Sequence, residues 1–173
     1  MKKILIRGKP GIGKTSVIKK LLPKLEEKIE NIVGFYTEEK REFNKRTGFD
    51  IVEINGERIP LARIDSPKRT KIGRYGVFVE NIDIVSERFL KRVRYCKHKS
   101  TIFIVDEFGK MEFLSLRFVE LTKEIFTKDC NLIGTIPVYP IKYLQPFLTS
   151  DIHLLEINQY NRDLIPAEIL KLS

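Results

Sequence analysis

One short segment near the start of the chain has the residue types and spacing that bind phosphate groups. Residues 8–15 read Gly-Lys-Pro-Gly-Ile-Gly-Lys-Thr, which fits the pattern G-x-x-x-x-G-K-[ST] at every position. Glycines let backbone N–H groups turn inward around phosphate oxygens, and the start of a following helix adds partial positive charge. Lys14 can reach the terminal phosphates and the Thr15 hydroxyl can bind Mg²⁺. The segment therefore indicates a phosphate chain bound together with a divalent cation.

Two adjacent carboxylates form the second half of the predicted site. The apolar run over residues 102–105 is typical of a buried central strand, and it ends in Asp106 and Glu107. Asp106, at the end of a strand neighbouring the phosphate loop, is expected to hold Mg²⁺ through a water beside Thr15. Glu107 faces away from Asp106, yet at the strand end it can reach the terminal phosphate and deprotonate a water. We therefore expect Thr15 and Asp106 as the metal site.

Transfer of a phosphoryl group also needs positive charge on its developing oxygens. Candidates are Arg41, Arg46, Lys110 and Arg162, and the cluster over residues 40–46 is the most suggestive because a loop there could fold over the phosphates. The expected catalytic residues are Glu107, Lys14, Arg41 and Arg46. The expected nucleotide-binding residues are Gly8, Lys9, Pro10, Gly11, Ile12, Gly13, Lys14, Thr15, Ser16, Asp106, Glu107 and Gly109.

The elements that must position these groups follow from hydrophobic spacing. A buried strand at 3–7 runs into the phosphate loop, and apolar residues at helical spacing predict a helix from Lys14 to about Glu30. Residues 32–79 read differently, as strands at 32–37, 47–54, 57–63 and 75–79 with an Asn55-Gly56 hairpin turn and a polar loop at 65–74. The remaining chain predicts helices at 84–95, 113–126 and within 160–172, and strands at 101–105, 131–136 and 152–157.

Composition bounds the function classes. The chain has 173 residues, suited to one domain, and 32 Lys and Arg against 23 Asp and Glu give a net charge of +9. The charge is uneven, because residues 1–100 carry +12 and residues 101–173 carry −3. We expect no membrane span or signal peptide, and the presence of only two cysteines predicts the reducing cytoplasm as the location. A monomer is the default expectation. Many Lys and Glu with no Trp are typical of heat-stable proteins.

Several residues favour a structural interpretation over a functional one. His153 lies in an apolar strand and is expected to be a core histidine, and Cys96 and Cys130 are expected to be small core residues. His98 is isolated. The aromatic side chains of the segment after the strand at 131–136 could stack on a base, but we expect them in packing or in a plain loop; they are Tyr139, Tyr143 and Phe147.

The motifs together resemble the small nucleoside-triphosphatase family first named from thermophiles, which includes the cancer-related nucleoside triphosphatases. The resemblance covers nearly the whole chain. Besides the phosphate loop, its most specific strings are Gly34-Phe35-Tyr36-Thr37-Glu38-Glu39 and Asp106-Glu107-Phe108-Gly109-Lys110-Met111-Glu112.

That resemblance implies a fold and a reaction. The implied fold is a RecA-like phosphate-loop core of α/β class in three layers, with a strand added beside the loop strand and an antiparallel excursion at about residues 32–79. The implied reaction is slow, Mg²⁺-dependent hydrolysis of ATP, GTP, CTP, UTP and similar triphosphates with low base selectivity.

Two other functions fit the residues. A nucleotide or nucleoside kinase would use the same loop and metal site, with basic residues at 58–74 binding an acceptor. A switch that binds nucleic acid under nucleotide control would use the basic half, but nucleic acid is less favoured because no recognisable nucleic-acid module accompanies the charge.

Overall fold

The computed structural model describes residues 2–54, 56–96, 100–139 and 142–172. The strands found there are β1 (Lys3–Gly8), β2 (Ile32–Glu42), β3 (Lys45–Glu53), β4 (Arg58–Arg63), β5 (Lys71–Ile72), β6 (Tyr75–Val77), β7 (Ile102–Asp106), β8 (Asn131–Pro137) and β9 (Ile152–Glu156). The helices are α1 (Lys14–Glu26), α2 (Val79–Tyr95), α3 (Leu116–Thr127) and α4 (Ile165–Leu172), with short 3₁₀ turns η1 (Glu112–Leu114) and η2 (Gln145–Phe147). None of these helices is long and apolar enough to cross a bilayer.

All described strands join one sheet in the order β5-β6-β4-β3-β2-β7-β8-β1-β9. The neighbours from β2 through β9 pair in parallel, and those from β5 through β2 pair antiparallel. The added strand is β8, which separates the loop strand β1 from β7. The expected antiparallel excursion at 32–79 is therefore present as the other half of the same sheet.

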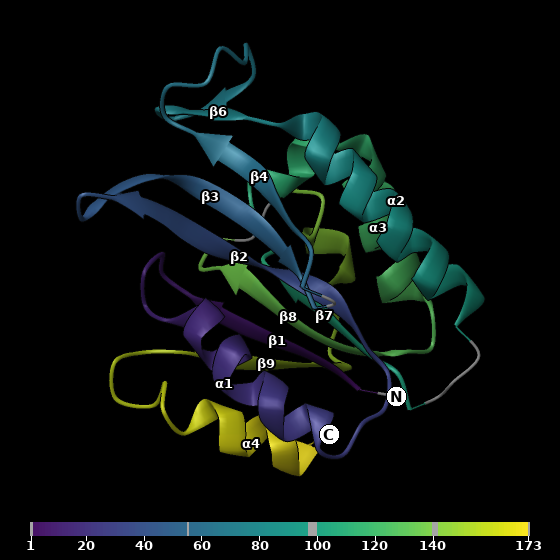
Figure 1. Ribbon diagram of the computed structural model, residues 1–173. Helices are drawn as coiled ribbons and strands as arrows, with labels where there is room; N and C mark the ends of the chain where they lie inside the picture. The colour runs from purple at the N-terminus through teal and green to yellow at the C-terminus, as the bar shows by residue number, and fades with distance from the viewer. Residues whose placement is uncertain (1, 55, 97–99, 140–141, 173) are drawn as a thin grey trace.

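Alternation along the central strands divides the core into two layers of side chains. In β7, Ile102 and Ile104 join the cluster that α1 and α4 cover, whereas Phe103 and Val105 join the cluster under α2 and α3. Figure 1 shows the two helix pairs on opposite faces of the sheet. Because side chains of a strand alternate between faces, a wholly apolar strand such as β7 must be covered on both sides. The result is the expected three-layer α/β arrangement.

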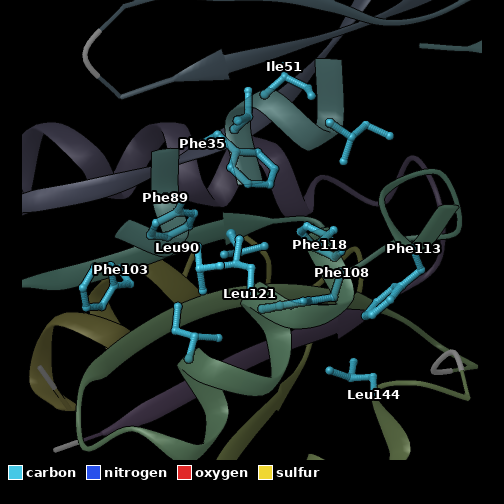
Figure 2. Close-up of a cluster of buried hydrophobic side chains, with 14 of the residues drawn as sticks. Phe35, Ile51, Phe89, Leu90, Phe103, Phe108, Phe113, Phe118, Leu121 and Leu144 are labelled. Atoms are coloured by element: carbon cyan, nitrogen blue, oxygen red, sulfur yellow. The ribbon is translucent and has the colours of Figure 1, made fainter. Parts of the chain in front are cut away.

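The layer under α2 and α3 is rich in phenylalanine (Figure 2). Phe118 of α3 contacts Phe35 edge to face at a centroid distance of 6.3 Å, and it lies 5.8 Å from Phe108. Phe108 follows directly after the acidic pair 106–107. This packing holds the chain just beyond β7 rigidly against the core.

β2 takes part in both halves of the sheet. Residues Ile32–Tyr36 pair in parallel with β7, and residues 35–42 pair antiparallel with β3. The expectation of a loop at 40–46 was wrong, because β2 and β3 run through it and only Phe43 and Asn44 form the turn. Both faces of this end of the hairpin are exposed, so the apolar alternation that marks a half-buried strand is missing there.

Other expectations differ from the structure in detail. α2 begins at Val79 and takes up the end of the strand predicted at 75–79, α1 ends at Glu26, and the polar loop contains the short strand β5. His153 is exposed and not a core histidine, because β9 forms the outer edge of the sheet. Cys130 is buried and Cys96 is half-buried. The expectations for Asn55 and His98 lie outside the described residues.

Candidate active site

The phosphate loop connects the end of β1 at Gly8 to the start of α1 at Lys14. Gly11 and Gly13 have φ angles of 76° and 109°, in the region that favours glycine. A Cβ at Gly8 would lie 2.4 Å from a methyl carbon of Ile157, so the chain needs glycine there for close packing. The glycines of the motif thus serve the backbone path that the loop must take.

Lys14 is buried and directed into the site, with 6% of its surface exposed. Its Nζ donates to the carbonyl oxygens of Gly8 and Lys9 at 3.0 and 3.3 Å and lies 3.1 Å from Oε2 of Glu107. A buried ammonium group needs such partners because losing water is costly for a charge. The loop and the carboxylate therefore hold a cation at the place where the motif expects the terminal phosphates.

Thr15 of α1 and Asp106 of β7 meet, although β7 is not a neighbour of β1, the strand that leads into the phosphate loop. The expectation of adjacent strands was wrong, since β8 lies between β1 and β7. The Thr15 hydroxyl nevertheless donates to Oδ2 of Asp106 at 2.6 Å, and the Thr135 hydroxyl of β8 donates to Oδ1. The strand between them contributes Thr135, which the sequence reasoning did not identify.

The donor set at Thr15 and Asp106 suits a hard divalent cation. Asp106 is 1% exposed, and burial raises the pKa of its carboxyl above the ordinary range despite the two threonine hydroxyls. The negative charge of Glu107 adds to the rise. A dication beside this carboxylate would offset both effects, and hydroxyl and carboxylate oxygens are the ligands that Mg²⁺ prefers. These residues fit Mg²⁺.

Glu107 and Glu112 lie on either side of Gly109. A Cβ at Gly109 would lie 2.5 Å from Oε2 of Glu112 and 2.9 Å from Cγ of Glu107, so glycine permits both carboxylates to approach. Glu112 is 4% exposed, and burial together with the negative Glu107 raises its pKa to about 8. Glu112 belongs to the Asp106–Glu112 string of the sequence, but no role was predicted for it. The pattern that could have indicated its burial is a charged residue directly followed by the apolar Phe113 and Leu114.

The two candidate arginines lie on the β2–β3 hairpin and share one carboxylate. Arg41 donates to Oε2 of Glu39 through Nε and Nη2 at 2.9 and 2.6 Å, and Nη1 of Arg46 donates to Oε1 at 2.8 Å. Burial raises the pKa of Glu39, but the hydrogen bonds from Arg46 and Arg41 outweigh it and hold that pKa below the ordinary range. Glu39 is thus a second residue that sequence reasoning did not select.

One cleft of about 930 Å³ brings most of these groups together. The loop between β1 and α1 and the tip of the β2–β3 hairpin lie at the same end of the strands, at the left in Figure 1. Gly8, Lys9, Ile12 and Asp106 are the expected site residues that do not line the cleft. The expected residues that line it are Pro10, Gly11, Gly13, Lys14, Thr15, Ser16, Arg41, Arg46, Glu107, Gly109 and Lys110.

A second, smaller cavity of about 260 Å³ adjoins the phosphate loop on the α1 side. It is lined by Arg162 and by Gly13, Ser16, Val17, Lys20 and Asp163. None of the three expected aromatic residues lines either cavity. Tyr143 stacks on Phe113 and Phe147 on Phe126, while Tyr139 is 88% exposed.

Comparison with known proteins decides the family. A profile of the family described as NTPase matches residues 3–170. Nucleoside-triphosphatase THEP1 from Thermotoga maritima is 40% identical, over 97% of this chain and 93% of that protein. The chain belongs to this NTPase family. The cancer-related nucleoside-triphosphatase homolog of Mus musculus is 31% identical, over 96% of this chain and 94% of the mouse protein.

Solved structures agree with the family and its fold. The crystal structure of THEP1 from the hyperthermophile Aquifex aeolicus has a TM-score of 0.85 and 31% identity, over 99% of this chain and 98% of that one. A solution structure of a human cancer-related nucleoside triphosphatase has a TM-score of 0.81 and 28% identity, over 99% and 97% of the two chains. The family predicted from the motifs and the α/β phosphate-loop fold are confirmed.

Proposed function

We propose that this member of the NTPase family hydrolyses nucleoside 5′-triphosphates to diphosphate and phosphate in the cleft at the phosphate loop, with Mg²⁺ bound. One observation carries the proposal. The buried Lys14 ammonium group lies 3.1 Å from Glu107, beside the Thr15–Asp106 pair at 2.6 Å. A phosphate-binding cation, a pair of metal-binding oxygens and a carboxylate base therefore converge at one end of one cleft.

In the proposal the phosphate loop binds the triphosphate group of the nucleotide. Backbone N–H groups of the loop and the start of α1 receive the phosphate oxygens, with Lys14 at the terminal phosphates and Ser16 further along the chain. Thr15 and Asp106 would hold Mg²⁺, and the ion, when bound there, would supply positive charge to the phosphate oxygens in the transition state.

The chemical step needs a base and a charge clamp. Glu107 accepts a proton from a water whose oxygen bonds to the terminal phosphorus, and the bond from that phosphorus to the bridging oxygen breaks. The electron pair of the broken bond leaves with the nucleoside diphosphate. Lys14 balances the charge that develops on the transferred phosphoryl group. In the proposal one arginine of the β2–β3 hairpin, Arg41 or Arg46, completes this clamp, and it must exchange Glu39 for the phosphate.

The proposal includes low base selectivity and slow turnover, and a different part of the structure supports each. The cavity on the α1 side is bounded by exposed side chains, including the ion pair of Lys20 Nζ and Asp163 Oδ1 at 2.7 Å. Strong discrimination needs buried polar groups that a wrong ligand leaves unpaired, so this cavity supports acceptance of ATP, GTP, CTP and UTP alike. Turnover is slow because Glu39 holds both arginines away from the phosphoryl group.

The proposal also covers the oligomeric state, the location and other partners of the protein. The proposal assigns the reaction to one domain over residues 1–173, which supplies the phosphate loop, the acidic pair and both arginines, and takes a monomer as the acting state. Two cysteines in 173 residues give no disulfide framework, which supports the cytoplasm as the location. Nucleic acid is a secondary partner because no recognisable nucleic-acid module accompanies the basic charge, part of which lies in surface ion pairs such as Lys19–Glu38 and Lys20–Asp163.

Removal of the Lys14 ammonium group tests the proposed function. Phosphate release from ATP, GTP, CTP and UTP is measured with and without Mg²⁺ for the wild type, Lys14→Ala and the control Lys24→Ala, which changes an exposed lysine of the same helix. We expect Mg²⁺-dependent release from all four, lost about 10²-fold or more in Lys14→Ala and kept in the control. Equal release by Lys14→Ala and the wild type would overturn the proposal.

A further inference from the structure

The cleft has an apolar end that a phosphate chain does not use. Phe49, Leu61, Ile72 and Met111 line the same cleft as the phosphate loop. Three of them, Phe49, Ile72 and Met111, are only partly buried, so they keep apolar surface facing the cleft. Its volume of about 930 Å³ lies at the upper end of small-molecule sites, which span about 300–1,000 Å³. The cleft therefore has the volume of a small-molecule site, and part of its lining is apolar.

The direction of the phosphate chain leaves this end free of the nucleoside. In the proposed function Lys14 binds the terminal phosphates, and its Nζ lies against Glu107, whose segment continues to Gly109 and Met111. The terminal phosphate thus faces the apolar end. Ser16, next to Thr15 at the start of α1, lines both the cleft and the smaller cavity, which also contains Arg162. A nucleoside placed in the smaller cavity would lie away from Met111, which lines only the cleft.

One arginine is fixed at the apolar end. The Arg46 guanidinium lies 5.2 Å from the centre of the Phe49 ring, donates through Nε to the Tyr75 hydroxyl at 3.0 Å and through Nη1 to Glu39 at 2.8 Å. These bonds use two of the five N–H donors of a guanidinium. A cation held by three contacts loses little side-chain entropy when it binds an anion.

The local charge favours an anion. Glu39 is one carboxylate between two guanidinium groups, those of Arg41 and Arg46, so the three side chains together carry a net positive charge. Lys110 adds an exposed ammonium group to the lining of the same cleft. Charge and apolar surface thus occur side by side, which suits a molecule that has both an anionic group and a hydrophobic body.

We propose that the apolar end of the cleft, formed by Phe49, Leu61, Ile72 and Met111, binds a second small molecule with a flat apolar body and an anionic group that Arg46 receives. This molecule lies next to the terminal phosphate and binds together with the nucleotide. The inference rests on the proposed function for the direction of the phosphate chain.

An aromatic sulfonate is a direct probe of such a site. The fluorescence of 1-anilinonaphthalene-8-sulfonate is titrated with the full chain, and we expect saturable binding of one probe per chain. Ile72→Gln and Arg46→Gln remove the apolar surface and the cation, and each should weaken binding at least about fivefold. The matched control Leu116→Gln changes a residue that is 80% exposed on α3 and outside the cleft, and it should bind as the wild type does. Thermal unfolding of each variant reports whether it folds.

Competition with two triphosphates locates the probe. With Mg²⁺ present, we expect the probe to stay bound at saturating inorganic triphosphate and at a saturating non-hydrolysable nucleoside triphosphate. Displacement by the nucleoside triphosphate alone would place the base at the apolar end, and displacement by both would place the probe on the phosphate loop. Either result overturns the inference, as does equal binding by folded Ile72→Gln and wild type. Phosphate release measured on the same samples separates the two proposals: hydrolysis without probe binding defeats only this one.

Discussion

At the scale of single residues, the proposed site depends on which groups bind the Lys14 ammonium group. Without a ligand, its ammonium group is held by two backbone carbonyls and by Glu107 at 3.1 Å. In the proposed reaction a phosphate chain takes over the ammonium group. Glu107 then loses this ion-pair partner and is free to receive the proton of the attacking water.

Glu112 predicts how stability depends on pH. Its pKa rises from 4.5 to about 8 because of burial and of the negative Glu107. Between these values the folded chain holds a proton that the unfolded chain has released, so the free energy of unfolding falls as the pH rises through the window. Asp106, whose pKa is also raised, contributes in the same direction.

We expect Glu112→Gln to flatten this slope. The wild type should lose about 3 kcal/mol or more of its free energy of unfolding by pH 8, and the variant should not show this loss. Urea unfolding from pH 5 to 9 measures it, and the control Glu168→Gln changes an exposed carboxylate on α4. The interpretation of Glu112 fails if its variant keeps the slope of the wild type.

The residues found from sequence alone were those whose role depends on local spacing. The phosphate loop needs eight consecutive residues, and Asp106 and Glu107 needed only the apolar strand before them. Thr135 and Glu39 were missed because their roles depend on which strands become neighbours. Glu112 was visible in a motif, but only its burial beside Glu107 distinguishes it from a solvated side chain.

At the scale of elements, β2 connects the two halves of the sheet. Its first residues pair in parallel with β7 and its later ones antiparallel with β3, so one strand carries the chain from the catalytic core to the arginine-bearing hairpin. The sequence indicated the strands but not their order, since pairing of distant segments leaves no local pattern. The hairpin tip was predicted as a loop because its exposed faces lack alternation.

Gly34 allows β2 to approach β7. Its φ is 150°, and a Cβ there would lie 1.9 Å from the carbonyl oxygen of Ile104. We expect Gly34→Ala to destabilise the fold by about 3 kcal/mol or more, because backbone atoms on both strands must move. The control Gly56→Ala lies in open space with a φ of 91° and should cost only about 1 kcal/mol of strain. Chemical denaturation measures the free energy of unfolding of both variants. Equal losses would show that the close approach of β2 to β7 at Gly34 does not limit stability.

At the scale of the whole molecule, many of the basic side chains behind the net charge of +9 lie in ion pairs. Lys19 and Arg58 both bind Glu38, Arg63 binds Asp50 and Arg88 lies 2.9 Å from Glu53. Such pairs lower the local potential that a nucleic-acid backbone meets. Lys14, Lys110 and the two hairpin arginines add positive charge to the lining of the cleft.

We therefore predict weak, salt-dependent binding of RNA. A short fluorescent RNA should bind with a dissociation constant above about 1 μM at physiological ionic strength, as expected of contacts with phosphates alone. Fluorescence anisotropy against salt measures it, with phosphate release from ATP followed in the same buffers. Submicromolar binding that persists in salt would favour the nucleic-acid switch instead.

The role of Glu107 is the most direct test of the whole account. Mg²⁺-dependent phosphate release is measured at saturating ATP for the wild type and for Glu107→Gln, which keeps the size of the side chain and removes its basicity. We predict a fall in kcat of about 10²-fold or more, with ATP binding retained because Lys14 and the loop stay in place. Full activity of Glu107→Gln at saturating ATP would contradict the account.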